Sequence, residues 1–123
     1  MTYDAAFARL AKSPFRSRFR LTDRDLAYIE AKGLAEIRRH AEDFVRERLA
    51  PAEIPNDGKQ TPMQGHPVFV AQHATACCCR GCLRKWYRVP EGRELTQAQQ
   101  EKITDLLMIW IRRQMDENGK GGS

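Results

Sequence analysis

The sequence predicts a mainly α-helical fold: one compact small domain with a long Pro/Gly-rich loop and a cysteine-rich knuckle. Its 123 residues fit a single domain. Apolar residues recur at helical intervals over residues 34–49 and again over 97–115, and prolines and glycines cluster between these stretches. All four cysteines lie within residues 77–82. Hydrophobic residues make up 41% of the chain and charged residues 30%, which is ordinary for a globular domain.

The first 20 residues are predicted to form a basic arm ahead of the helical domain. We place the domain at residues 21–116 and a flexible tail at 117–123. A short helix beginning near Tyr3 would end at Ser13, because the residue before a proline avoids the helical conformation. Phenylalanines alternate with arginines further along the arm: Phe15, Arg16, Arg18, Phe19 and Arg20. Such a pattern can stack on nucleic-acid bases, but we favour the simpler interpretation that the phenylalanines dock the arm onto the domain.

Two helices are predicted in the first half of the domain. Thr22 is a good N-cap, and the helix that it opens ends at Gly33. The next helix covers residues 34–49, where apolar residues recur with a 3.6-residue period and the opposite side is charged. His40 lies on the charged side, so we interpret it as a surface histidine. Pro51 helps to end this helix.

A long loop is predicted from residue 50 to residue 67, a stretch with four prolines. Loops of this length in small domains are usually functional or disordered. Asn56-Asp57-Gly58 has the composition of a turn, and a dense set of polar side chains stands beside it: Asp57, Lys59, Gln60 and Thr61. The loop leads directly into His66, which is why we do not treat it as a mere linker.

Three further segments complete the chain. Pro67 suits the first position of a helix, although the β-branched residues that follow leave a strand open. Residues 83–87 are predicted to form about one helical turn. Thr96 and Gln99 form a capping box that opens the last helix. The predicted buried stripe of that helix consists of Ile103, Leu106, Leu107, Trp110 and Ile111.

The cysteine cluster predicts a metal site, with zinc as the expected ion. Cys79 and Cys82 form a C-x₂-C knuckle, in which the turn directs both sulfurs to one side. A knuckle supplies only half of a tetrahedral site, so other ligands must come from nearby. We expect His73 as the third ligand and Cys78 or His66 as the fourth. His66 and His73 would lie about 10 Å apart on one helix, so both cannot bind the same ion without a break.

Two other interpretations of the cluster remain open. One cysteine, Cys78 or Cys79, could be a nucleophile whose pKa is lowered by nearby basic residues, with His73 or His66 as base. The basic residues would be Arg80, Arg84 and Lys85. Alternatively, the cysteines pack as small apolar residues and have no chemical role.

The net charge of +5 is unevenly distributed along the chain. Residues 1–20 and residues 77–93 each contain five basic side chains against one acidic side chain. Basic clusters of this kind attract nucleic acid or an acidic protein, although a solvated surface explains them as well. We predict a zinc-stabilised binding module, possibly nucleic-acid binding. Its contacts would come from Arg80, Arg84, Lys85, Trp86 and Arg88. The alternative is a metal- or thiol-dependent enzyme with a site between the 56–66 loop, His73 and the cysteine cluster.

Several classes of protein are disfavoured. The longest uninterrupted apolar run, residues 106–111, is far too short to span a bilayer. Asp4 and Arg9 stand where a secretory signal would be apolar, so we expect a cytoplasmic protein with reduced thiols and no membrane association. P-loop, dinucleotide-binding and H-E-x-x-H motifs are absent, as is the H-x-E element of zinc deaminases.

The central part of the chain resembles a known family. Residues 58–76 read GKQTPMQGHPVFVAQHATA, and Cys78-Cys79-Arg80-Gly81-Cys82-Leu83 and Lys85-Trp86 follow. These segments are similar to a small bacterial family catalogued as a domain of unknown function, family 4186, and the similarity extends from about Phe19 to Trp110. The family brings no assigned activity.

The resemblance also bears on the ligand set. Its pattern has threonine where this chain has Cys77, and histidine where this chain has Tyr87. It therefore implies that Cys77 is not a shared ligand, and that the candidates are His66, His73, Cys78, Cys79 and Cys82.

Overall fold

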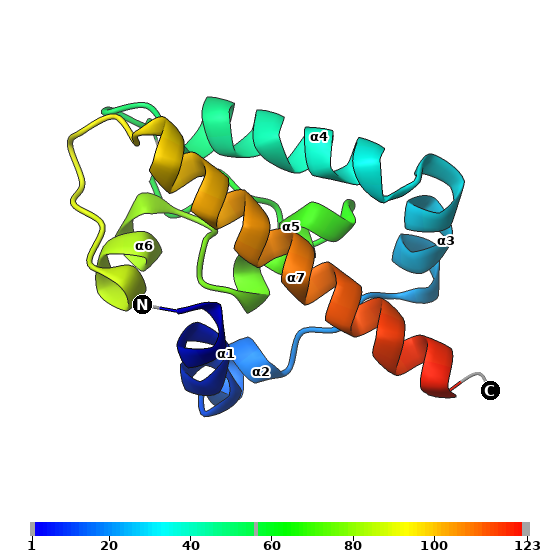
Figure 1. The fold of residues 1–123 in the computed structure, drawn as a ribbon. Helices are drawn as coiled ribbons and strands as arrows, with labels where there is room; N and C mark the ends of the chain where they lie inside the picture. Colours follow the sequence, from blue (N-terminus) through cyan, green and yellow to red (C-terminus); the bar gives the residue numbers. More distant parts are fainter. Residues whose placement is uncertain (1, 56, 122–123) are drawn as a thin grey trace.

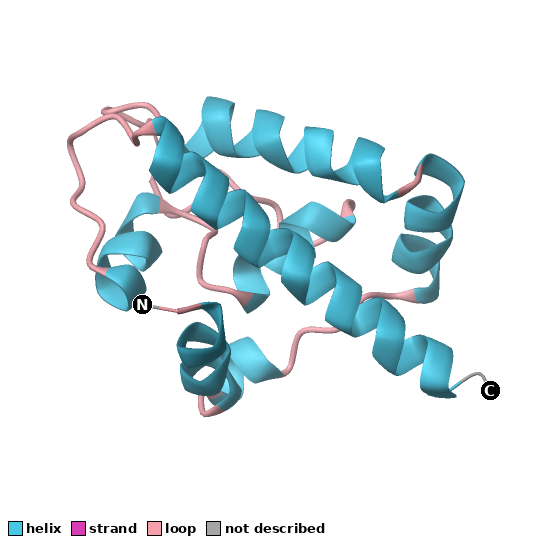
Figure 2. Cartoon of the chain, viewed as in Figure 1, coloured by secondary structure: helices cyan, strands magenta, loops and turns pink. Residues whose placement is uncertain are grey.

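The computed structural model describes residues 2–55 and 57–121, and within them the fold is all-helical, which confirms the predicted fold class. Helices joined by loops account for the described chain, with no strand among these residues (Figure 2). A π-helical turn, η1, continues α4 without a break. The elements are α1 (Tyr3–Ala11), α2 (Pro14–Ser17), α3 (Asp23–Lys32), α4 (Leu34–Phe44), η1 (Val45–Leu49), α5 (Pro67–Ala74), α6 (Arg80–Tyr87) and α7 (Gln97–Gly121).

Most helix starts follow from local capping chemistry that the sequence already contains. Thr22 and Asp25 form a capping box at α3, and Gly33 ends that helix with a φ of 85°. Thr96 and Gln99 form a second capping box at α7, with N–H to side-chain oxygen distances of 2.9 and 3.1 Å. At α5 the His66 side chain is the N-cap. These predicted starts are confirmed, and residues 67–74 are helix rather than strand.

The core forms where α4 and α5 pack against the long helix α7, which runs across the middle of the molecule (Figure 1). Side chains from all three helices are fully buried there, including Ile37, Val68 and Leu107. The predicted stripe of α7 is confirmed, since all five of its residues are buried. Helix α3 packs against α4. Helix α6 contains Cys82, and Cys79 is its N-cap.

The N-terminal segment is helical over most of its length and contacts the core. Ala6 and Leu10 of α1 are buried, and the Tyr3 hydroxyl donates a hydrogen bond to Asp105 of α7 over 3.1 Å. Phe19 packs on the His73 ring, whereas Phe15 is exposed. At the other end the helical backbone of α7 continues to Gly121, and residues 122–123 lie outside the described residues. The division into arm, domain and tail stays a prediction.

One buried cation fixes the end of the molecule that holds the cysteines. The Arg80 side chain is only 4% exposed, and its guanidinium donates four hydrogen bonds to backbone carbonyls. Two of them go to Leu49 and Pro51 at the end of η1, each over 3.0 Å, and two go to Pro90 and Arg93, each over 2.7 Å. Arg80 therefore ties the start of α6 to the loop that follows this helix and to the end of η1, which lies about 30 residues earlier.

Replacement of Arg80 should destabilise the fold strongly. Arg80→Ala removes a buried cation and leaves four carbonyls without the donor that it supplies, and we expect the free energy of unfolding to fall by at least about 3 kcal/mol. Arg84→Ala is the matched control, because Arg84 makes only an exposed ion pair with Glu91, which should be worth less than about 1 kcal/mol. Urea denaturation followed by circular dichroism measures both, and equal losses would contradict the role given to Arg80.

Candidate metal centre

The cysteines are brought together by two tight turns that flank them. Just after the end of α5, Ala76 adopts the left-handed conformation with a φ of 60°. The Cys77 N–H donates to the Gln72 carbonyl over 2.8 Å, which completes a Schellman motif. Cys79 is the N-cap of α6, and its sulfur accepts a hydrogen bond from the Cys82 N–H over 3.3 Å. Cys78 lies between the two turns, so its sulfur faces the same space as those of the knuckle.

Three sulfurs converge in a geometry that suits a single ion. The Sγ atoms of Cys78, Cys79 and Cys82 all lie within 4.8 Å of one another. Those of Cys78 and Cys82 are 3.6 Å apart. Zinc–sulfur bonds of about 2.3 Å in a tetrahedron require sulfurs about 3.8 Å apart. Only a small contraction of the cluster is therefore needed. Cys78 and Cys79 are buried, and Cys82 is partly exposed.

Arg16 of α2 supplies a positive charge directly beside the sulfurs. Its guanidinium nitrogens lie 3.6 Å from Cys78 Sγ and 3.2 Å from Cys82 Sγ, and one of them also donates to the His73 carbonyl over 2.7 Å. A fixed cation at this distance favours the thiolate form. The sequence analysis missed Arg16, because it is more than 60 residues away from the cysteines along the chain. Several arginines lie in the first 20 residues, and the sequence offers no reason to single out Arg16 among them.

The thiol pKa values show that the three sulfurs differ. Hydrogen bonds from Cys82 and from Arg16 lower the pKa of Cys78, against the opposing effect of burial. The pKa of Cys82 is raised by its hydrogen bond to Cys78 and by burial. Burial also raises the pKa of Cys79. Arg16 and Cys82 thus favour the charged form at Cys78 more than at the other two sulfurs, and an ion bound to all three sulfurs would replace the protons that they carry.

Cys77 is separate from this group. It is fully buried in the core, and its sulfur faces the Thr75 carbonyl at 3.5 Å. Burial raises the pKa of the Cys77 thiol to about 12. For this one cysteine the interpretation as a small apolar residue holds.

His73 lies near the cluster but faces the long loop. Its side chain is 8% exposed, and Nε2 lies 3.1 Å from each of the Thr61 and Pro62 carbonyl oxygens. Two acceptors at this nitrogen mean that Nε2 carries the proton. Its ring atoms are not among the group of three ligand atoms that the described residues bring together. What His73 does is join α5 to the loop, while Phe19 stacks on its ring.

His66 pairs with a different histidine. Its Nδ1 accepts from the Val68 N–H over 3.0 Å, so the proton must reside on Nε2, which lies 3.0 Å from Nδ1 of His40. The other ring nitrogen of His40 donates to Glu36 over 3.3 Å. A metal bound at Nε2 would take the place of this proton and move it to Nδ1, which could then no longer accept from Val68. His66 therefore cannot cap α5 and bind a metal through Nε2 at the same time. His40, which we predicted to be a surface histidine, is instead partly buried in this chain of hydrogen bonds.

The predicted long loop is anchored to the cysteine segment. The Asp57 carboxylate accepts from the N–H groups of Arg80 and Gly81 at the start of α6, over 3.0 and 3.3 Å. The Thr61 hydroxyl donates to the Cys78 carbonyl over 2.7 Å. These caps explain why α6 begins at Arg80, three residues before the predicted helical turn. Asn56, which we placed in a turn here, lies outside the described residues.

The residues predicted to contact nucleic acid are not all available at the surface. Arg80 is buried, with its guanidinium bound to four backbone carbonyls, so it cannot be part of the predicted contact surface. Arg84 is exposed but paired with Glu91 over 3.0 Å. Lys85 and Arg88 are exposed and line a hollow of about 440 Å³ together with Arg9, Trp86 and Tyr87. Arg9 lies over the Trp86 ring, 5.0 Å from its centroid.

The fold and the thiol cluster define a small all-helical domain with a site able to hold a metal ion. The chain belongs to a family described as a domain of unknown function (DUF4186), whose model matches residues 4–112. The resemblance seen in the sequence is thereby confirmed. No solved structure gives a significant match to this chain. Within the described residues, no helix has the length and apolar character needed to cross a membrane.

The N-cap role of His66 should make stability depend on pH. Burial, followed by the nearby charge of His40, lowers the pKa of His66 to about 4 from 6.5. Between pH 4 and pH 6.5 the unfolded chain binds a proton at His66 that the folded chain does not bind. The contribution of the uncharged His66 to the free energy of unfolding is therefore fully present above pH 6.5 and is lost as the pH falls toward 4. His66→Asn keeps a cap without a titrating group. We expect this variant to flatten the decline relative to the unchanged protein.

Thermal unfolding at several pH values between 4 and 8 measures the difference. The two proteins should differ little at pH 8 and diverge below pH 6.5, with the unchanged protein losing more stability. Parallel curves across this range would contradict the tautomer assigned to His66.

Proposed function

We propose that this protein is a zinc-stabilised binding module in which Cys78, Cys79 and Cys82 hold the metal. The convergence of their sulfurs within 4.8 Å carries the proposal. Three thiolates and one Zn²⁺ sum to a single negative charge, which the guanidinium of Arg16 balances at 3.2 Å from Cys82. A thiolate set of this kind suits zinc better than hard ions such as magnesium, which prefer oxygen ligands.

The structural effect of such an ion would extend well beyond the knuckle. The Cys78 carbonyl accepts a hydrogen bond from the Thr61 hydroxyl of the long loop, and Cys79 is the N-cap of α6. Arg16 joins the sulfurs to α2. An ion at this point would therefore hold together the N-terminal helices, the loop and α6. For a domain of this size, that is a substantial addition to a modest core.

The fourth ligand of a tetrahedral zinc ion has to come from outside the three cysteines. We propose that this fourth ligand is a solvent molecule or a group from a partner, bound on the side of Cys82, which is the least buried of the three cysteines. The alternative, a metal- or thiol-dependent enzyme with its site between the 56–66 loop, His73 and the cysteine cluster, would use that same position. We favour the binding module because the His73 ring is buried and its Nε2 is engaged with two carbonyls, so it is poorly placed to act as a base.

For the partner we propose nucleic acid, bound at the hollow around Trp86. Three exposed cations, Arg9, Lys85 and Arg88, line it together with two aromatic rings, and no acidic residue does. Cations contact phosphates, and an aromatic ring provides a surface for a base. Arg84 is close by, in an exposed ion pair that costs little to open. Four free cysteines support a reducing compartment such as the cytoplasm as the place of action.

Metal content is the direct test of the proposed centre. Elemental analysis of the purified full-length protein should find one zinc per chain. Cys82→Ser removes a ligand and should lower zinc affinity by more than about 100-fold, beyond what loss of a group outside the ligand shell usually costs. Cys77→Ala is the matched control, because the Cys77 sulfur faces Thr75 and not the cluster, and it should retain full zinc content.

Thiol titration under native conditions provides the second readout. The thiols of Cys78, Cys79 and Cys82 should be protected in the zinc-loaded protein and should become reactive on chelation, whereas the fully buried Cys77 should stay unreactive in both states. The centre would be refuted if the protein purified without metal and with these three thiols already reactive. It would also be refuted if a Cys82→Ser variant kept its zinc while both variants remained folded by circular dichroism.

Salt dependence tests the proposed partner. A short DNA duplex contacted by Arg9, Lys85 and Arg88 should bind with a log–log salt slope of about −0.9 for each phosphate neutralised, or about −2.7 in all. Replacing the three cations by Gln should remove most of this slope. The control replaces Arg39, Arg46 and Arg112 by Gln, which changes the net charge equally at exposed positions outside the hollow. Fluorescence anisotropy at several salt concentrations measures each protein.

Two results would overturn the nucleic-acid assignment. One is binding that does not change with salt, and the other is an equal loss in the control. Binding of polyglutamate in preference to DNA would identify an acidic protein as the partner and would likewise contradict it.

A further inference from the structure

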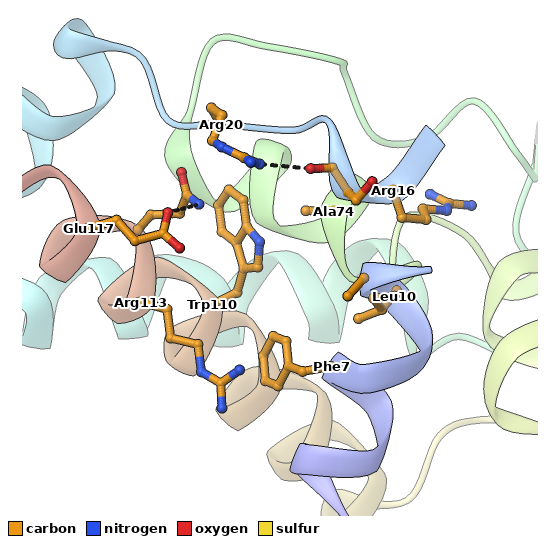
Figure 3. Close-up of a pocket in the computed structure, with 11 residues that line it drawn as sticks. Phe7, Leu10, Arg16, Arg20, Ala74, Trp110, Arg113 and Glu117 are labelled. Carbon is orange, nitrogen blue, oxygen red and sulfur yellow. Dashed lines mark hydrogen bonds between the residues drawn. The ribbon is translucent and has the colours of Figure 1, made fainter. Parts of the chain in front are cut away.

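A second cavity, separate from the proposed nucleic-acid surface, lies between the N-terminal helices and the C-terminal half of α7 (Figure 3). It has a volume of about 250 Å³. Its wall combines apolar side chains with cationic ones, chiefly Phe7, Leu10, Ala74 and Trp110 with Arg20 and Arg113. A cavity of about 150 Å³ is enough to hold benzene in a protein interior. This one has room for a ring and an additional polar group.

The Trp110 indole has an unused hydrogen-bond donor in this wall. The Trp110 residue is 8% exposed, and no hydrogen bond joins its N–H to a described residue. The nitrogen is not among the fully buried polar atoms without a partner, so the N–H reaches the open space of the cavity. The N–H of a largely buried tryptophan usually finds a partner. Figure 3 shows the indole at the centre of the cavity, with its nitrogen on the side of Leu10 and Ala74. The protein thus leaves one donor facing a space that an acceptor can occupy.

The charges around the cavity favour an anion. Arg20 is held by hydrogen bonds from Nη1 to the Ser17 and Phe19 carbonyls, over 2.7 and 2.8 Å, which leaves Nη2 and Nε for another acceptor. Arg113 lies over the Phe7 ring, 4.1 Å from its centroid, and its contact with the exposed Asp4 is weak at 3.4 Å. Glu117 is the acidic residue of the wall. Arg16 also lines the cavity, but its guanidinium is committed to the thiolates.

Two available cations against one carboxylate leave a single positive charge in the wall. We propose that this cavity binds a small organic monoanion: a carboxylate attached to an apolar body about the size of one ring. The carboxylate accepts from the Trp110 N–H and from the Nη2 or Nε donors that Arg20 leaves open. The apolar body packs against Phe7, Leu10 and Ala74.

Benzoate is a suitable probe, with the Trp110 indole N–H as the reporter. The chain has two tryptophans, and Trp86→Phe assigns the Trp110 indole signal in a ¹H–¹⁵N spectrum of the full-length protein. Benzoate should shift that signal saturably, with a Kd of about 1–10 mM for a ligand of its size. Arg20→Gln removes a charge-assisted hydrogen bond and should weaken binding by about tenfold or more.

Matched ligands and variants make the result decisive. Benzyl alcohol has the same ring without the charge and should bind at least about tenfold more weakly than benzoate. Arg112→Gln removes the same charge from an exposed position on α7 outside the cavity and should leave the Kd unchanged. The proposal fails if benzoate gives no saturable shift, if benzyl alcohol binds equally well, or if Arg20→Gln and Arg112→Gln have the same effect while the spectra show both folded.

Discussion

The burial of the Arg80 guanidinium among four backbone carbonyls is the constraint on which the cysteine end of the molecule depends. A buried cation is costly unless its donors are satisfied, and here carbonyls from the end of η1 and from the 90–93 segment meet four of its five N–H groups. Asp57 completes the arrangement by capping the N–H groups of the same helix turn. These contacts fix the position of α6, and hence of Cys79 and Cys82.

Arg16 has the complementary role, since it reaches the sulfurs from outside the cysteine segment. Arg80 uses its charge to satisfy backbone groups, whereas Arg16 places its charge beside the sulfurs of Cys78 and Cys82 and lowers the pKa of Cys78. Because Arg16 belongs to α2, its contacts with the sulfurs join the N-terminal helices to the cysteine segment. The same charge therefore links the electrostatics of the site to the docking of the first 20 residues.

The sequence predicted those features that depend on local chemistry. Periodicity gave α4 and α7, and capping residues such as Thr22 and Thr96 gave the helix starts, because these signals act within a few residues. The roles of the arginines could not be predicted in this way, since Arg80 differs from Arg84 only in the distant carbonyls that surround it. The left-handed turn at Ala76 was also hidden, because glycine is the residue that normally marks such a position. Spacing likewise suggested His66 as a ligand, whereas its contact with His40 depends on the tertiary packing of α4 against α5.

The position of Arg16 gives the two proposed sites a physical connection. Its guanidinium contacts Cys78 and Cys82, and its side chain forms part of the wall of the cavity around Trp110. A metal ion bound to three thiolates would leave one negative charge beside Arg16, which would hold α2 in the position where Arg16 lines the cavity. By linkage, a ligand that favours this same position of α2 would favour metal binding to the same degree. The two proposed sites would thus be coupled through one short helix that contributes to both.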